Sequence, residues 1–224
     1  MPAGRRAGYG RRYSACGLVV VAWLVGSTST ANGVAGREPP LPKDRPLLKM
    51  IVAYGLFGFG YVVTATFLVA IVRQGGGGRV FEAAVWMVTG LAGLPSLWLW
   101  QKVAARVGLY AAYALACLVE VVGVTASVAV GGHAGPLLAG VLFGGTFIAL
   151  TALGLQTARQ LVPQAPRRVL AMMTAAFGIG QIIGPIAAGL LAQASGNYVL
   201  ASIMAALILL ASGLIAWSAA PKSP

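Results

Sequence analysis

The stretch 50–72, MIVAYGLFGFGYVVTATFLVAIV, contains no charged residue, and it decides the fold of this chain. A helix needs about 20 mostly apolar residues to cross the hydrocarbon core of a membrane. Lipid offers no hydrogen-bond partner to an open backbone, so a segment of this kind crosses as a helix. The stretch therefore predicts a transmembrane helix that ends at Arg73.

Five further segments of the same kind follow, each bounded by charged residues or by a turn containing glycine or proline. The predicted spans are 83–100, 108–130, 136–158, 169–193 and 199–219. The chain is 58% hydrophobic and only 9% charged, whereas soluble domains carry about 25% charged residues. We therefore predict an all-α membrane protein with a six-helix transmembrane domain at 50–219. The segment 1–49 precedes this domain, and a short tail, 220–224, follows it.

Basic residues outnumber acidic ones, with 16 Lys and Arg against 4 Asp and Glu. They form short clusters between apolar spans, which favours the positive-inside rule over a nucleic-acid-binding face. On one side lie Arg37, Lys43, Arg45, Lys49, Lys102, Arg106, Arg159, Arg167, Arg168 and Lys222, and on the other only Arg73 and Arg79. We expect a multi-pass protein of the plasma (cytoplasmic, inner) membrane with a cytoplasmic C-terminus and no nucleic-acid partner.

The first part of the chain permits several interpretations. Residues 16–26 are apolar, but this run is short for a span and close to the length of a signal-peptide core. A signal peptide, an odd extra helix and the remnant of a preceding helix are all open, and we favour a partial helix. The proline-rich segment 37–49 predicts a linker.

Three stretches carry a family resemblance: AYGLFGFGYVVTATFL at 53–68, LFGGTFIALTALGLQ at 142–156 and AMMTAAFGIGQIIGP at 171–185. They resemble the seventh, tenth and eleventh helices of the YbfB/YjiJ group of major facilitator superfamily transporters. The resemblance covers about 48–219 and implies a six-helix bundle like the C-terminal half of that fold. It also implies membrane transport of a small-molecule substrate, with lipid as surroundings. We expect no enzymatic activity, no cofactor and no metal site.

Transporters of this superfamily have twelve spans in two halves, and the solute passes between the halves. This chain resembles one half. We therefore predict a half-size transporter that moves a small solute by alternating access, completed by a second six-helix half or by a homodimer. The alternative is a non-transporting fragment or an assembly subunit of a membrane complex.

A superfamily loop with the pattern G-x-L-A-D-R-x-G-R-R corresponds here to QKVAARVG at 101–108. Arg106 and Gly108 match this pattern and are the candidate gating residues. Gln101 replaces the first glycine and Ala105 replaces the aspartate, so the motif is degraded.

In the family the first and fourth helices of a half line the central cavity, and the second and fifth flank it. On the first span, Tyr54 and Tyr61 are two helical turns apart and share a face, and Thr64 follows. These three are candidate pathway residues, and ordinary helix packing is the alternative. The glycines of this span, which we expect to admit a neighbouring helix closely, are Gly55, Gly58 and Gly60.

Four more pathway candidates lie on the fourth and fifth spans. Thr146 and Gln156 belong to the fourth span, and Thr174 and Gln181 to the fifth. Gln181 carries a whole amide in the middle of its span, and an unpaired buried amide costs about 1–3 kcal/mol. It therefore needs water or a partner, either as a pathway residue or as a contact between helices.

Glu120 is the only acidic residue of the sequence that falls within a predicted span. An ionisable group at membrane depth costs at least about 2.5 kcal/mol, so it is a functional candidate by default. Possible proton coupling is one interpretation. A protonated or partnered structural carboxyl is the other, because the third span is peripheral in the family.

Overall fold

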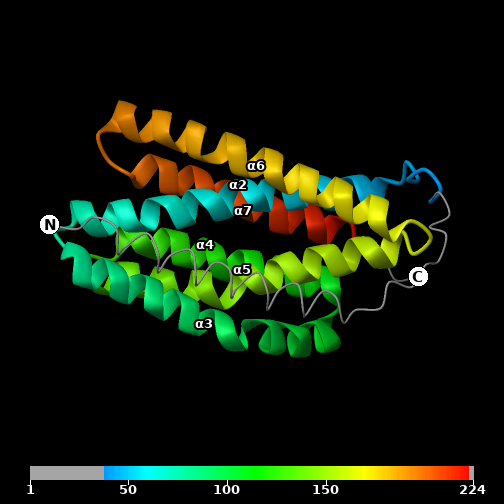
Figure 1. Ribbon diagram of the computed structural model, residues 1–224, viewed down its shortest axis with the longest axis horizontal. Helices are drawn as coiled ribbons and strands as arrows, with labels where there is room; N and C mark the ends of the chain where they lie inside the picture. Colours follow the sequence, from blue (N-terminus) through cyan, green and yellow to red (C-terminus); the bar gives the residue numbers. More distant parts are fainter. Residues whose placement is uncertain (1–37, 222–224) are drawn as a thin grey trace, which may run out of the picture. The chain divides into compact units, whose positions relative to one another are not determined.

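The computed structural model describes residues 38–221. Its helices are α2 (Arg45–Gln74), α3 (Gly78–Val107), α4 (Leu109–Ala129), α5 (Ala134–Leu161), α6 (Pro166–Ser195) and α7 (Val199–Ser218) (Figure 1). All six are long and apolar enough to cross a membrane, which confirms the predicted fold class. The partial helix predicted at 16–26 lies outside the described residues.

The helices extend beyond most of the predicted spans. α3 begins at Gly78 instead of 83 and continues to Val107 instead of 100. Helical hydrogen bonding persists past the apolar segment because the ends of a span can leave the hydrocarbon core. Proline at the first turn begins both α2 and α6, where the missing N–H has no helical partner to lose.

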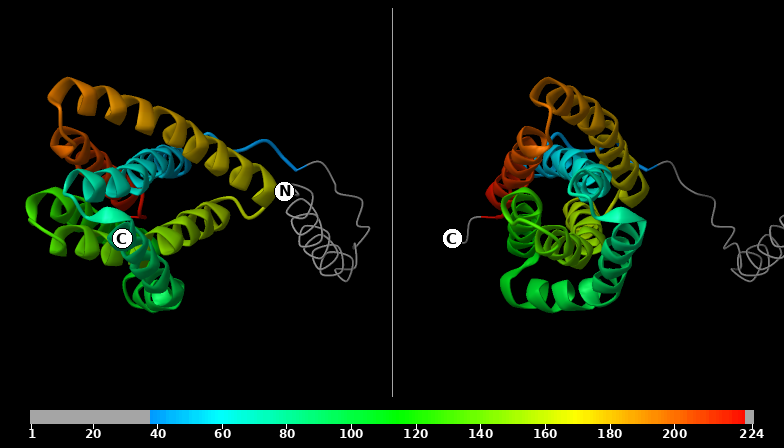
Figure 2. Two further views of the ribbon diagram at one scale, coloured as in Figure 1. Left: turned by 60° about the vertical axis from the view of Figure 1, so that its left-hand side comes forward. Right: turned by 90° about the vertical axis from the view of Figure 1, so that its left-hand side faces the viewer.

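The helices form a front layer and a back layer. α2 and α5 lie at the centre of the front layer, with α6 packed against α2 and α3 packed against α5. α4 and α7 form the back layer, where they contact each other, and they pack mainly on α5 and α2 respectively (Figure 2). Among the described residues α3 and α6 do not contact each other, so the front face is open between them.

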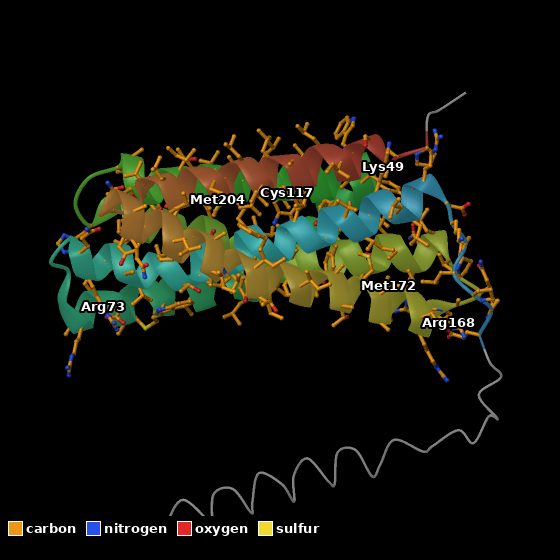
Figure 3. All side chains as sticks on the ribbon, turned by 90° about the horizontal axis from the view of Figure 1, so that it is seen from above. Lys49, Arg73, Cys117, Arg168, Met172 and Met204 are labelled. Atoms are coloured by element: carbon orange, nitrogen blue, oxygen red, sulfur yellow. The ribbon has the colours of Figure 1, made fainter. Side chains whose placement is uncertain are left out.

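Successive helices run in opposite directions, so the loops alternate between the two ends of the bundle. We name the end at which α2 begins and α7 finishes the basic end. Eight of the ten Lys and Arg residues in 38–221 lie there. Lys49 and Arg168 are at this end in Figure 3, and Arg73 is at the other.

Glycine brings α2 and α6 into close contact. A Cβ atom on Gly180 would lie 2.7 Å from the backbone nitrogen of Phe59 and would overlap the carbonyl oxygen of Gly55. A Cβ atom on Gly58 would lie 3.0 Å from the Cα atom of Phe177. The predicted close approach at the α2 glycines is thus confirmed, and it fixes α6 along the flank of α2.

A buried hydrogen-bond network ties the back layer to α2. The Ser212 hydroxyl of α7 donates to the carbonyl oxygen of Ala53 over 2.7 Å. The Tyr113 hydroxyl of α4 lies 3.2 Å from the Ser212 hydroxyl. Both residues are buried, so these bonds hold α4, α7 and α2 in register behind the open face.

The linker before α2 also contacts α6. The two carboxylate oxygens of Glu38 accept hydrogen bonds from the backbone N–H groups of Arg167 and Arg168, at 3.1 and 2.9 Å. These N–H groups belong to the first turn of α6 and have no partner within the helix. Glu38 therefore caps α6 from a distant part of the chain.

Candidate solute pathway

A pocket of about 890 Å³, which we call the polar pocket although Ala152, Leu155 and Leu170 also line it, opens at the basic end of the front face. It lies between α3, α5 and α6, with the loop between α5 and α6 at its edge. Its polar lining residues are Gln101, Gln156, Arg159 and Gln160. Its volume falls within the range of about 300–1,000 Å³ that is usual for small-molecule sites.

Gln156, a predicted pathway residue, lies in this pocket and contacts Gln101. The Gln101 amide nitrogen donates to the Gln156 amide oxygen over 3.1 Å. This hydrogen bond joins α3 to α5 along the pocket wall, and both side chains stay partly accessible. The pocket therefore presents amide groups that still have unused hydrogen-bonding capacity.

Arg159 lines the same pocket and forms no ion pair within the described part of the chain. Among the described residues, the ion pair is formed by Arg73 and Glu82 at the opposite end of the bundle, with an N–O distance of 2.7 Å. Glu38 is engaged by α6, Glu120 is in the core, and Asp44 begins α2 without bonding to Arg159. The pocket consequently carries an uncompensated positive charge.

Deeper in the bundle, Tyr61 belongs to an aromatic cluster formed by α2, α5 and α6. Its ring stacks on those of Phe143 and Phe147, with centroid distances of 5.5 and 5.7 Å. Phe177 of α6 and Phe57 of α2 complete the cluster, at 5.8 and 5.9 Å from Tyr61. At 1.5 Å per residue, Phe147 lies about 13 Å along α5 from Gln156, which bonds in the pocket.

Tyr54 lies on the same face of α2 as Tyr61 but is more deeply buried, with 2% of its surface exposed. Its ring packs against Phe177 at 5.2 Å between centroids, and it fills the space left by Gly154 of α5. The structure thus brings Tyr54 and Tyr61 together through Phe177, with Tyr61 the more accessible of the two.

The three threonine candidates are placed apart from one another. The hydroxyls of Thr64, Thr146 and Thr174 each donate to a carbonyl one turn earlier in their own helix, at 2.9, 2.8 and 2.8 Å. Thr64 lies near Ser127 and Ser202 on the side of the back layer, and not with Tyr61 at the front. Thr174 is exposed on α6, and Thr146 is buried.

Gln181 lies on α6, one turn beyond Phe177, and is half-buried. Within residues 38–221 its amide has no hydrogen-bond partner. The neighbouring Gly180 packs against α2. Gln181 is therefore a free polar group close to the aromatic cluster.

Glu120 is fully buried in α4, and neither of its carboxyl oxygens has a hydrogen-bond partner among the described residues. It does not line the pocket at the basic end. Glu120 thus lies behind the open face and not on it.

The degraded loop motif forms the tight turn between α3 and α4. Gly108 has a φ of 85°, a conformation that side chains disfavour, and it separates the two helices. Arg106 is exposed in the last turn of α3. Gln101, where the motif has glycine, is the residue that bonds to Gln156 in the pocket.

Sequence reasoning did not select several residues that the structure gathers at the front face: Gln101, Arg159, Phe143, Phe147 and Phe177. The spacing of Phe143 and Phe147, one turn apart on one helix, is a signal that was available. Arg159 was counted only among the cations that set topology. Gln101 gave no signal, because its partner belongs to another helix.

A comparison with protein families identifies the group to which the chain belongs. The family model described as "Uncharacterised MFS-type transporter YbfB" matches residues 9–217. Among curated proteins, none matches the chain. The match and the six apolar helices together indicate a multi-pass membrane protein of the transporter class. The chain belongs to the YbfB-type family of major facilitator superfamily transporters.

Proposed function

We propose that this chain moves a small solute across the membrane by alternating access, with its open front face as one wall of the pathway. The observation that carries the proposal is the position of the polar pocket and the aromatic cluster. Both lie on the front layer, where α3 and α6 do not meet. Gln181, midway along α6, also has an amide without a partner among the described residues, and such a group would be costly if this face were exposed only to lipid.

The second wall of the pathway is another six-helix unit, either a second copy of this chain or a separate half. Alternating access requires two units that rock about a site between them. A wall with an uncompensated arginine and a free Gln181 amide is suited to a water-filled space and a facing partner. Tyr61, Gln156 and Gln181 are the solute contacts that we propose along this wall.

We further propose that the basic end faces the cytoplasm and that Glu120 is the proton-carrying group if transport is proton-coupled. Eight of the ten described cations lie at the basic end, in agreement with the positive-inside rule. Among the described residues, Glu120 is the one carboxyl that is fully buried, and it lies on α4 in the back layer. Protonation there would alter the charge behind the aromatic cluster.

Native mass spectrometry of the purified chain in mild detergent tests the requirement for a second wall. We expect a complex that contains two 22.8-kDa chains, or one chain with another six-helix protein. A monomer under all conditions would mean that the pathway has no second wall, which would contradict autonomous transport. It would favour the alternative function, a non-transporting fragment or assembly subunit.

A further inference from the structure

The pocket at the basic end has an unbalanced set of polar groups. Arg159 contributes guanidinium donors and a full positive charge, and no carboxylate within the described residues lines the pocket. Two carboxylates that could act as counterions have other partners, since Glu38 caps α6 and Glu82 pairs with Arg73. The charge on Arg159 is thus available to a ligand.

The glutamine amides add further donors. Gln101 and Gln156 share one hydrogen bond, which uses one N–H group and one carbonyl oxygen. The pair keeps three N–H groups for other partners, and the count is the same if both amides are flipped. Gln160 lines the same pocket with a third amide. A free amide offers donors and acceptors in equal number, so the excess of donors among the lining side chains comes from the Arg159 guanidinium.

We propose that this pocket binds an oxyanion group, a carboxylate or a phosphate, and that the transported solute carries such a group. That the bound solute is transported rests on the proposed function, whereas binding of an oxyanion to the pocket does not depend on that function. Charge-assisted hydrogen bonds from guanidinium and amide groups are the strongest contacts that such a lining can make. An organic cation would be repelled by Arg159, because no carboxylate among the described residues lines the pocket to compensate this charge.

The pocket is also placed where an anion would be expected to enter. Arg167 and Arg168 begin α6 at the same end of the bundle, so the local potential favours negative solutes. The aromatic cluster about 13 Å further along α5 is apolar and carries no charge. A small organic acid would thus meet the anion site at the mouth and an aromatic surface deeper in.

Equilibrium binding to the purified full chain in an uncharged detergent tests the proposal by ¹⁹F NMR. The probes are 4-fluorobenzoate and monofluorophosphate, with 4-fluorobenzamide as the neutral isostere that reports partitioning into detergent. We expect saturable line broadening for at least one of the two anions and none for the amide. Arg159→Gln should weaken anion binding about tenfold, as expected for loss of a charge-assisted contact.

Arg168→Gln is the matched control, because it removes one positive charge from the same end without altering the pocket lining. It should weaken the binding of both anions by less than about twofold, because a charge outside the lining acts only through the diffuse potential of this end, which salt screens. Equal binding by wild type and Arg159→Gln, or equal broadening by the benzamide, would overturn the proposal. Arg159 is exposed, so its replacement should not impair folding, and a monodisperse elution profile checks this.

A final comparison separates a solute from a lipid headgroup. The same titration in nanodiscs of phosphatidylcholine, with and without phosphatidylglycerol, should give the same affinity for the soluble anion. Loss of probe binding on addition of phosphatidylglycerol would assign the pocket to lipid and overturn the assignment to a solute. A negative binding result leaves the requirement for a second wall intact, because oligomeric mass tests that separately.

Discussion

The side-chain amides of Gln101 and Gln156 lie 3.1 Å apart and join α3 to α5 beside the polar pocket. The two residues are far apart in the chain, so this contact depends on the packing of the whole front layer. A double-mutant cycle with Gln101→Leu and Gln156→Leu should give a coupling of about 0.5–1.5 kcal/mol in the free energy of unfolding. Unfolding by a denaturing detergent measures it, and strictly additive effects would mean that the bond does not form in the membrane protein.

The close contact between α2 and α6 predicts that one added methyl group is harmful at Gly180. Gly180→Ala should lower the free energy of unfolding by about 1–3 kcal/mol, because the Cβ atom would overlap the backbone of α2. Gly178→Ala is the matched control on the same helix, since nothing lies within 4 Å of its Cβ position. It should be neutral or slightly stabilising through helix propensity. Equal effects of the two variants would argue against this helix crossing.

The cap that Glu38 provides predicts local opening of α6 when the carboxylate is removed. In Glu38→Gln the amides of Arg167 and Arg168 should exchange hydrogen about fivefold faster, the size expected for loss of an N-terminal cap. Hydrogen exchange followed by mass spectrometry measures the peptide that begins α6. Asp44→Asn is the control, because Asp44 makes no side-chain cap to α2. Unchanged exchange in Glu38→Gln would place the linker elsewhere.

The unpartnered carboxyl of Glu120 predicts that an apolar replacement stabilises the fold. Glu120→Leu should raise the free energy of unfolding by about 1–3 kcal/mol, because it removes buried polar atoms that lack partners. Glu120→Gln keeps two polar atoms in the same place and should give a smaller gain. Thermal unfolding in detergent measures both. A loss of stability in Glu120→Leu would reveal a hydrogen-bonded partner for this carboxyl.

Much of the fold was predictable because long apolar stretches in lipid have few structural choices. The six spans, the alternation of the basic loops and the close approach at Gly55 and Gly58 all follow from local sequence. The ends of α3 did not, since nothing in composition shows how far a helix continues beyond the hydrocarbon core.

The candidate site was less predictable, because its contacts join distant segments. Gln156 was predicted as a pathway residue of the fourth span, but its partner Gln101 is on another helix and gave no signal of its own. Thr64 was grouped with Tyr61 by spacing alone. Its hydroxyl donates a hydrogen bond to the carbonyl oxygen of Gly60, one turn earlier in the same helix. Any helical threonine can form such a bond, so the spacing did not indicate a shared site.

The central claim is that the front face lines an aqueous pathway. By contrast, we expect the exposed apolar side chains of α7, in the back layer, to face lipid. Cysteine accessibility in permeabilised membrane vesicles tests it most directly, in a chain whose native Cys16 and Cys117 have been replaced. Single cysteines at Gln181 and at Leu207, an exposed residue midway along α7, are treated with a water-soluble maleimide that does not partition into hydrocarbon. Because the reactive form is the thiolate, which requires water, we predict rapid labelling at Gln181 and none at Leu207. Labelling at Gln181 as slow as at Leu207 would contradict an aqueous pathway along this face.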